Sequence, residues 1–199
     1  MKHSAVTPLK LIISGPVGAG KTTFVSTLSE DPVVNSDEQT TEEIGKTHTT
    51  VALDFGRFVL QGRPLHLFGT PGQSRFDFMW EILSEGALGL LLLVAGDRPA
   101  DFPQALSILR FITSRNPMPF IIAVTRQDSK GAWGPEKIAG YFAVPTTRVI
   151  GIDARNAQSS LGAVTCLLSL IEGSTSGNSR NPFHSTSHST SNSNVKEST

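Results

Sequence analysis

The stretch GPVGAGKT, residues 15–22, has the residue types and spacing of a phosphate-binding loop. It matches the pattern G-x-x-x-x-G-K-[ST], and it lies between an apolar run, LKLIIS, and a segment with helical character, TTFVSTL. Glycines allow backbone amides to turn toward phosphate oxygens, and the N-terminus of the following helix adds the positive end of its dipole. We therefore expect a nucleoside triphosphate to bind here. The residues expected to contact it are Gly15, Gly18, Ala19, Gly20, Lys21, Thr22 and Thr23.

Some side chains have individual roles in this prediction. Lys21 is expected to bridge the β- and γ-phosphates, and the Thr22 hydroxyl to ligate Mg²⁺. Thr50 closes the long polar segment 31–49, where a threonine can bring its hydroxyl to Mg²⁺ and its amide to the γ-phosphate. By itself Thr50 is an ordinary strand threonine, but the phosphate loop upstream favours the role of nucleotide and metal ligand.

A second chemical motif, GTPGQ, follows the apolar run PLHLF. The amide of Gly72 can donate to the γ-phosphate, and the side chain of Gln73 can orient the attacking water. Lys21 and Gln73 are therefore the predicted catalytic residues.

Two short motifs predict how the base is read. Thr125, Arg126 and Asp128 belong to TRQD, which follows the apolar run PFIIAV. The Asp128 carboxylate can accept hydrogen bonds from N1–H and the exocyclic amine of guanine, whereas adenine offers no matching pair of donors. In IDARN, residues 152–156, the amide of Ala154 is expected to donate to guanine O6, and Arg155 is counted among the nucleotide-binding residues.

The elements that must position these motifs alternate between strands and helices. Such alternation favours a mostly parallel sheet with helices on both faces, and the short QGR connection requires one antiparallel hairpin. We predict a P-loop α/β fold with a mixed six-stranded sheet. Its strands are expected at 9–14, 50–60, 64–69, 87–95, 119–125 and 147–152. Helices are expected after the phosphate loop, in 75–83, from Asp101 as N-cap, at 134–142 and at 159–173.

Composition limits the remaining possibilities. The 199 residues carry a formal net charge of zero, which gives no electrostatic case for nucleic acid or an anionic membrane surface. The longest apolar run, about ten residues at 87–96, is half the length of a membrane span. The only cysteine, Cys166, is expected to be buried. We expect a cytoplasmic protein without a membrane anchor, with one domain at 1–173 and a disordered Ser/Thr/Asn-rich tail at 174–199.

The order of these motifs resembles that of the Ras-like small GTPases. The words KTHTTVALDFGR and LFGTPGQSRFDFMW are similar to those of the bacterial MglA-type group and the related conservon GTPases, and the resemblance covers about residues 8–172. It implies a guanine-nucleotide switch that binds GTP or GDP with Mg²⁺, in which Thr50 and Gln73 lie in the two nucleotide-sensing loops. It also implies a protein partner, a roadblock-type regulator.

Two positions depart from the Ras pattern. Gly69 stands where an aspartate usually holds a water on Mg²⁺, and Asp54 on the neighbouring strand is a possible substitute. Val17 stands where Ras has a glycine close to the γ-phosphate, so we expect slow unaided turnover. The source of a catalytic arginine is open; Arg75 is expected to be a surface or partner-contact residue.

Several functions are compatible with these features. The leading hypothesis is a GTPase switch, and the alternative is a pseudo-GTPase that binds nucleotide without cycling. A P-loop kinase is disfavoured because residues 31–49 contain one lysine and no arginine for a lid, and an ATPase is disfavoured by Asp128. Residues 75–83 are rich in aromatic side chains. We expect Phe76, Met79 and Leu83 to face the core, and some of Phe78, Trp80 and Ile82 to face a partner.

Overall fold

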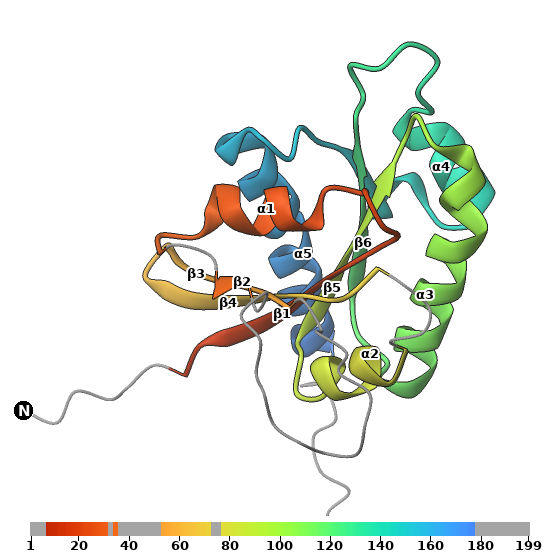
Figure 1. Cartoon of the computed structure of the whole chain (residues 1–199). Coiled ribbons are helices and arrows are strands. Elements are labelled where there is room, and N and C mark those ends of the chain that lie inside the picture. The colour runs from red at the N-terminus through yellow and green to blue at the C-terminus, as the bar shows by residue number, and fades with distance from the viewer. Residues whose placement is uncertain (1–6, 32–33, 36–52, 73–76, 178–199) are drawn as a thin grey trace, which may run out of the picture.

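A seven-stranded sheet forms the centre of the protein (Figure 1). The computed structural model describes residues 7–31, 34–35, 53–72 and 77–177. The order of the strands across the sheet is β2-β3-β4-β1-β5-β6-β7. The strands are β1 (Leu9–Ser14), β2 (Val34–Asn35), β3 (Asp54–Leu60), β4 (Arg63–Gly69), β5 (Gly89–Ala95), β6 (Phe120–Thr125) and β7 (Val149–Gly151). The six predicted strands are confirmed, and the two-residue β2 adds a seventh.

The sheet is mixed, as predicted. β1 pairs in parallel with β4 and β5, and β6 pairs in parallel with β5 and β7. β3 is antiparallel to both β2 and β4. The β3–β4 hairpin turns at Gln61 and Gly62, whose φ angles of 51° and 76° are both positive. Two-residue turns of this kind match the right-handed twist of the paired strands.

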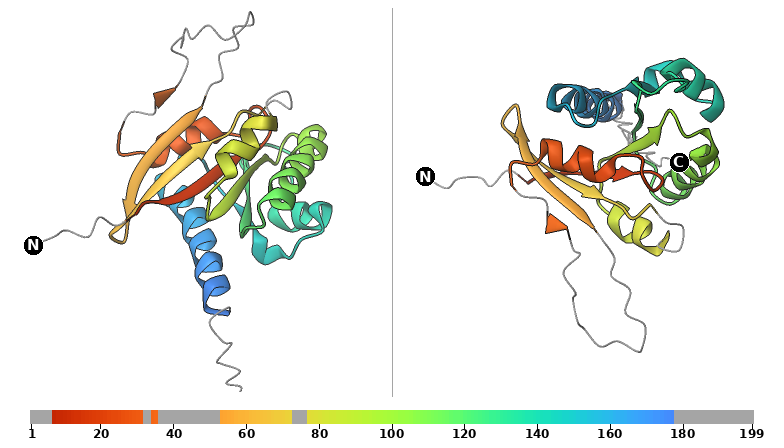
Figure 2. Two further views of the ribbon diagram at one scale, coloured as in Figure 1. Left: turned by 90° about the horizontal axis from the view of Figure 1, so that it is seen from below. Right: turned by 45° about the horizontal axis from the view of Figure 1, so that its top comes forward.

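Helices cover both faces of the sheet (Figures 1 and 2). Helices α1 and α5 pack in one core cluster and α2, α3 and α4 in the other, because the two clusters contain buried residues of those helices. The α-helices are α1 (Lys21–Leu28), α2 (Asp77–Ser84), α3 (Phe102–Arg115), α4 (Pro135–Phe142) and α5 (Ala157–Gly177). Short 3₁₀ turns, η2 (Pro99–Asp101) and η3 (Thr146–Arg148), precede α3 and β7.

Strand β5 explains why the longest apolar run of the chain is not a membrane segment. All seven of its residues are buried. Leu91 and Leu93 belong to the cluster under α1 and α5, whereas Leu90 and Leu92 belong to the cluster under α3 and α4. Alternate side chains therefore enter different cores, as expected for a strand covered by helices on both sides. Among the described residues, no helix is both long and apolar enough to cross a membrane.

The predicted nucleotide-binding motifs lie at one edge of the sheet. Strands β1, β4, β5, β6 and β7 run in the same direction, so their carboxyl ends meet at one edge. Strand β3 runs the opposite way, so its first residue, Asp54, lies at that same edge opposite Gly69. Ligands of open α/β sheets bind outside the carboxyl ends of the strands.

Two local predictions are wrong, and a third, the N-cap of α3, is confirmed in position only. Helix α5 ends at Gly177 rather than at Gly173, so the predicted boundary of the tail lies inside a helix; residues 178–199 lie outside the described part of the chain. Cys166 is exposed, because it lies on the outer side of α5. Asp101 occupies the N-cap position of α3 without a side-chain capping bond, and its carboxylate pairs instead with Arg98 at 2.9 Å.

Candidate nucleotide-binding site

The predicted phosphate loop connects β1 to α1 and depends on glycine. Gly15 has a φ of +143°, and a Cβ there would lie 2.2 Å from the Leu93 carbonyl oxygen. Gly18 has a φ of +77°, and a Cβ there would lie 2.4 Å from a guanidinium nitrogen of Arg98. A side chain at either position would be strained and would collide with its neighbour. Glycine at these two positions therefore permits both the backbone conformation of the loop and its close packing against neighbouring residues.

Lys21 folds back over this loop from the first residue of α1. Its Nζ donates to the carbonyl oxygens of Gly15 and Pro16, each at 2.8 Å. Burial lowers the pKa of Lys21 to about 8, an effect that the negative charge of Asp54 partly opposes. The ammonium group is thus held at the phosphate loop in a position from which it can bind an anion.

Two arginines from other loops hold the outer side of the phosphate loop. Arg98 donates to the Val17 carbonyl oxygen at 3.1 Å, and Arg126 donates to the Gly18 carbonyl oxygen at 3.0 Å. Arg126 also pairs with Asp97 at 3.6 Å. The sequence predicted that Arg126 belongs to the site but did not predict the contact of Arg98.

Thr125 joins the base-reading motif to the phosphate loop. Its side chain is buried, and its Oγ1 donates to the Ala19 carbonyl oxygen at 2.9 Å. The hydroxyl therefore fixes the end of β6 against the phosphate loop, which sets the distance between the residues expected to bind phosphate and those expected to bind the base.

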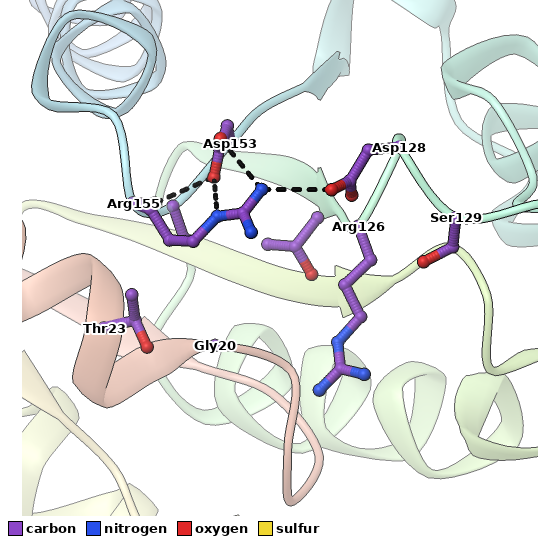
Figure 3. A pocket seen from close by; sticks show the side chains of 9 residues that line it. Gly20, Thr23, Arg126, Asp128, Ser129, Asp153 and Arg155 are labelled. Atoms are coloured by element: carbon purple, nitrogen blue, oxygen red, sulfur yellow. Dashed lines mark hydrogen bonds and ion pairs between the residues drawn. The ribbon is translucent and has the colours of Figure 1, made fainter.

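A pocket of about 330 Å³ lies where these elements meet (Figure 3). Asp128 and Arg155 line it, and the guanidinium Nη2 of Arg155 donates to Asp128 Oδ2 at 3.0 Å. The same guanidinium binds Asp153 through its Nε at 2.9 Å. The complete lining consists of Gly20, Thr23, Thr125, Arg126, Asp128, Ser129, Asp153, Ala154 and Arg155. Seven of these nine residues were predicted to bind the nucleotide, and one pocket brings them together.

Thr22, a predicted metal ligand, meets Asp54, the possible substitute for an aspartate at position 69, at the other end of the phosphate loop. Thr22 Oγ1 donates to Asp54 Oδ2 at 2.7 Å. A Cβ added to Gly69 would lie 2.8 Å from the Asp54 Cβ and 3.1 Å from Asp54 Oδ2. Asp54 therefore occupies the space into which a side chain at position 69 would project. A hydroxyl and a carboxylate are ligands that suit Mg²⁺, which usually takes one or two protein carboxylates together with phosphate and water.

Two side chains bind the backbone just before Gln73, at the start of the loop that is expected to sense the γ-phosphate. Trp80 Nε1 donates to the Pro71 carbonyl oxygen at 2.9 Å, and Gln104 Nε2 donates to the Gly72 carbonyl oxygen at 2.9 Å. Gly72 lies against the phosphate loop, since a Cβ there would be 2.7 Å from the Val17 nitrogen and 2.8 Å from Lys21 Nζ. Gly72, which is predicted to contact the γ-phosphate, thus lies beside Lys21, which is predicted to bind the phosphates.

Helix α2 presents the predicted face as far as it is described, and the structure decides which of Phe78, Trp80 and Ile82 is buried. Trp80 is buried at 4 % exposure, together with Leu83, and Met79 is half-buried. Phe78 and Ile82 are 52 % and 60 % exposed, as predicted for at least some of these apolar side chains. Trp80 turns inward because its indole N–H finds an acceptor at Pro71, while its ring packs against Phe111.

Several predicted residues lie outside the described part of the chain. They are Thr50, Gln73, Arg75, Phe76 and most of the polar segment 31–49. Their roles stay predictions. Conversely, four contacts were missed: those of Arg98, Asp153, Trp80 and Gln104. Asp153 could have been found from its position beside Ala154, whereas nothing in the local sequence of α3 indicates Gln104.

The fold and the site together define a P-loop nucleotide-binding protein with the fold of the small GTPases. A family described as "conserved hypothetical ATP binding protein" matches residues 30–146, and the chain belongs to this family. An uncharacterized protein of Methanocaldococcus jannaschii is 28 % identical over 123 residues, which are 60 % of this chain and 71 % of the relative.

A solved structure supports the same fold. The Arl6 (BBS3) small GTPase of Trypanosoma brucei, with bound GppNp, superimposes with a TM-score of 0.66 at 15 % sequence identity. The match covers 84 % of this chain and 99 % of the Arl6 chain. The predicted α/β fold is therefore confirmed, including the mostly parallel sheet and its covering helices.

Proposed function

We propose that the protein is a GTP-binding molecular switch that hydrolyses GTP to GDP slowly unless a partner assists it. One observation carries the proposal: a single pocket joins the start of α1 to the predicted guanine-reading residues Asp128 and Ala154. Gly20 of the phosphate loop and Thr23 of α1 line the same pocket. A bound guanine base and its phosphates would thus lie along one continuous surface.

The description of the family favours a second candidate ligand, ATP. The residues of the pocket support GTP. A carboxylate at position 128 can accept both N1–H and the 2-amino group of guanine. Adenine presents an acceptor at N1 and would leave an ionised carboxylate in the base pocket without a matching donor, a mismatch that costs free energy.

Thr22 is the described residue that would ligate Mg²⁺ together with the phosphates, Thr50 is the proposed second ligand, and Asp54 lies beside Thr22. Bound there, Mg²⁺ would neutralise charge on the β- and γ-phosphates. In this arrangement the Asp54 carboxylate does what an aspartate at position 69 would otherwise do: it accepts a hydrogen bond in the metal's surroundings.

Hydrolysis would use Lys21 and Gln73. Lys21 stabilises charge on the phosphates, and Gln73 orients a water molecule that attacks the γ-phosphorus, so that the bond to the β-phosphate oxygen breaks. Val17 is 52 % exposed, and its backbone lies against Gly72. Its branched side chain would crowd Gln73 or an incoming arginine, which is the reason for expecting slow unaided turnover.

The partner is proposed to contact α2. Phe78 and Ile82 expose apolar surface on this helix, directly after the loop that begins at Gly72. Aromatic and large aliphatic side chains are frequent anchors of protein interfaces. A regulator of the roadblock type, as the sequence resemblance implies, would read the nucleotide state from this surface.

Nucleotide competition tests the proposal. GTP, GDP and ATP would compete against a fluorescent guanine nucleotide, with and without Mg²⁺, for wild type, Asp128→Asn and the matched surface control Glu136→Gln. We expect a guanine preference of at least tenfold in wild type and the control. Asp128→Asn should lose it and gain affinity for xanthosine nucleotides, whose 2-oxo group suits an amide donor. Tighter binding of ATP than of GTP to wild type would refute GTP specificity.

The pseudo-GTPase alternative needs a separate measurement. Turnover of wild type and Gln73→Leu would be compared in the presence of a co-purified or candidate roadblock-type partner. We expect the partner to accelerate GTP turnover by wild type, whereas turnover by Gln73→Leu should remain slow. If neither protein hydrolyses its bound GTP, the pseudo-GTPase alternative is favoured.

A further inference from the structure

Arg155 connects two carboxylates at the rim of the pocket (Figure 3). Its Nη2 lies 3.0 Å from Asp128 Oδ2 and 3.1 Å from Asp153 Oδ2, and its Nε lies 2.9 Å from Asp153 Oδ1. The guanidinium thus binds both oxygens of Asp153 in a fork and reaches Asp128 with the same end. Forked arginine–carboxylate pairs fix orientation as well as charge.

Asp153 can hold this arginine in one position because hydrogen bonds fix the loop to which Asp153 belongs. Its Oδ1 also accepts the backbone N–H of Arg155 at 3.0 Å, and its backbone N–H donates to Ser159 Oγ at 3.0 Å. Asn156 caps the following helix, accepting the Ser159 N–H at 2.9 Å. The position of the guanidinium therefore follows from the structure of the loop before α5.

The two carboxylates share one cation. Asp128 and Asp153 line the same pocket, and Nη2 of Arg155 lies within hydrogen-bonding distance of both. Hydrogen bonds first to Asp153 and then to Asp128 raise the pKa of Arg155 above its ordinary value, and the side-chain bond from Arg155 lowers the pKa of Asp153. Arg126, the other arginine of the pocket, binds Gly18 and Asp97 instead. Among the described residues, Arg155 is the cation that pairs with Asp128.

We propose that Arg155 is a positioning residue for base recognition: it neutralises Asp153 and holds the Asp128 carboxylate ready to accept from N1–H and the 2-amino group of guanine. This inference rests on the proposed binding of GTP. An ionised carboxylate has about four acceptor sites, and the bond from Arg155 uses one of them. Two donors of the base can therefore bind the same carboxylate that Arg155 orients.

The alternative is that Arg155 only stabilises the surface. The side chains of Arg155 and Asp128 are each 67 % exposed, and exposed ion pairs contribute little to stability. A role in base recognition and a role in stability therefore differ in what they predict: the first changes the discrimination between bases and leaves the melting temperature almost unchanged.

The test is a double-mutant cycle in the full chain, with GDP and IDP as probes; IDP lacks the 2-amino group. Variants are Arg155→Gln, Asp153→Asn and their combination, with Arg63→Gln as control, since Arg63 makes an exposed ion pair with Glu172 remote from the pocket. We expect Arg155→Gln to weaken GDP at least tenfold and to reduce the preference for GDP over IDP. Adding Asp153→Asn should recover most of the loss, because it removes the charge that Arg155 neutralised.

The outcomes separate this inference from the proposed function. If wild type prefers GDP to ADP and Arg155→Gln binds GDP within twofold of wild type, the positioning role is wrong while GTP binding stands. A loss that Asp153→Asn does not recover also overturns it. Absence of guanine preference in wild type overturns both proposals. Arg155→Lys, which keeps the charge but not the fork, should fall between wild type and Arg155→Gln.

Discussion

Asp54 and Gly69 face each other across the β3–β4 hairpin, and the Asp54 carboxylate occupies the volume that a side chain at position 69 would need. The carboxylate also accepts a hydrogen bond from Thr22. An acidic group is thus present beside the phosphate loop, contributed by the antiparallel strand instead of the parallel one. A carboxylate therefore lies at this place although residue 69 is a glycine.

Exchanging the two residues tests this relationship. Asp54→Asn should weaken Mg²⁺-dependent retention of GTP by about 10- to 100-fold, the usual effect of losing a group that orients metal ligands. Gly69→Asp alone should destabilise the fold, because its Cβ would lie 2.8 Å from that of Asp54. The exchange Asp54→Gly with Gly69→Asp should restore Mg²⁺ dependence.

The measurement is the Mg²⁺ concentration that gives half-maximal retention of GTP, with Asp31→Asn as control because Asp31 pairs with Arg57 on the surface. An unchanged Mg²⁺ requirement in Asp54→Asn would contradict the assignment of Asp54 to the metal site.

Trp80 should report the state of the loop that begins at Gly72. Its indole N–H is bound to the Pro71 carbonyl oxygen, so movement of this backbone changes the surroundings of the ring. The chain has two tryptophans, and Trp133→Phe leaves Trp80 as the single fluorophore. We expect a non-hydrolysable GTP analogue to shift the emission maximum more than GDP does. Identical spectra with both nucleotides at saturation would argue against a nucleotide-sensitive loop.

The bond from Gln104 to the Gly72 carbonyl oxygen offers a companion variant. Gln104→Ala releases one of the two backbone attachments and should change the amplitude of the Trp80 signal. Gln127→Ala serves as a control of the same chemistry, because that side chain binds the Trp133 carbonyl oxygen on another loop.

Removal of Arg155 should raise the pKa of Asp153. The side-chain hydrogen bond from Arg155 lowers this pKa below its ordinary value in the folded protein. The stabilisation is therefore complete above the pKa of the unfolded chain and is lost as the pH falls through the folded value. In Arg155→Gln, carboxyl NMR titration should find a higher pKa for Asp153 than in wild type, although the backbone N–H of residue 155 still lowers it in part. A pKa equal to that of wild type would show that the backbone donor alone suffices.

We expect truncation of a side chain to lower the free energy of unfolding most in the core around β5, which has helices on both sides. Leu92 is fully buried, so Leu92→Ala should cost about 2–5 kcal/mol in the free energy of unfolding. For a chain of this size the melting temperature should fall by roughly 5–20 °C. Leu88→Ala, where the side chain is 40 % exposed, is the matched control and should shift it much less. Equal shifts in the two variants would refute this account of the core.

Much of the fold was predictable because its signals are local. The apolar run of β5, the QGR turn and the glycine spacing of the phosphate loop each lie within a few residues, and all three predicted their structures correctly. The inward orientation of Trp80 on α2 was not predictable in the same way, whereas the burial of Leu83 was predicted correctly. Most residues of α2 are apolar, so no polar side marks the exposed face, and a hydrogen bond to Pro71 decided that Trp80 faces inward.

The sequence by itself determined the pattern of a P-loop, the position of the carboxylate that we propose reads guanine, and the alternation of strands and helices that directs both to one edge of a sheet. Only the tertiary structure decided which distant side chains meet there. Antiparallel pairing brings Asp54 to Gly69, and the loop before α5 brings Arg155 to Asp128. Such contacts depend on strand register and side-chain rotamers, which the local pattern of residues does not specify.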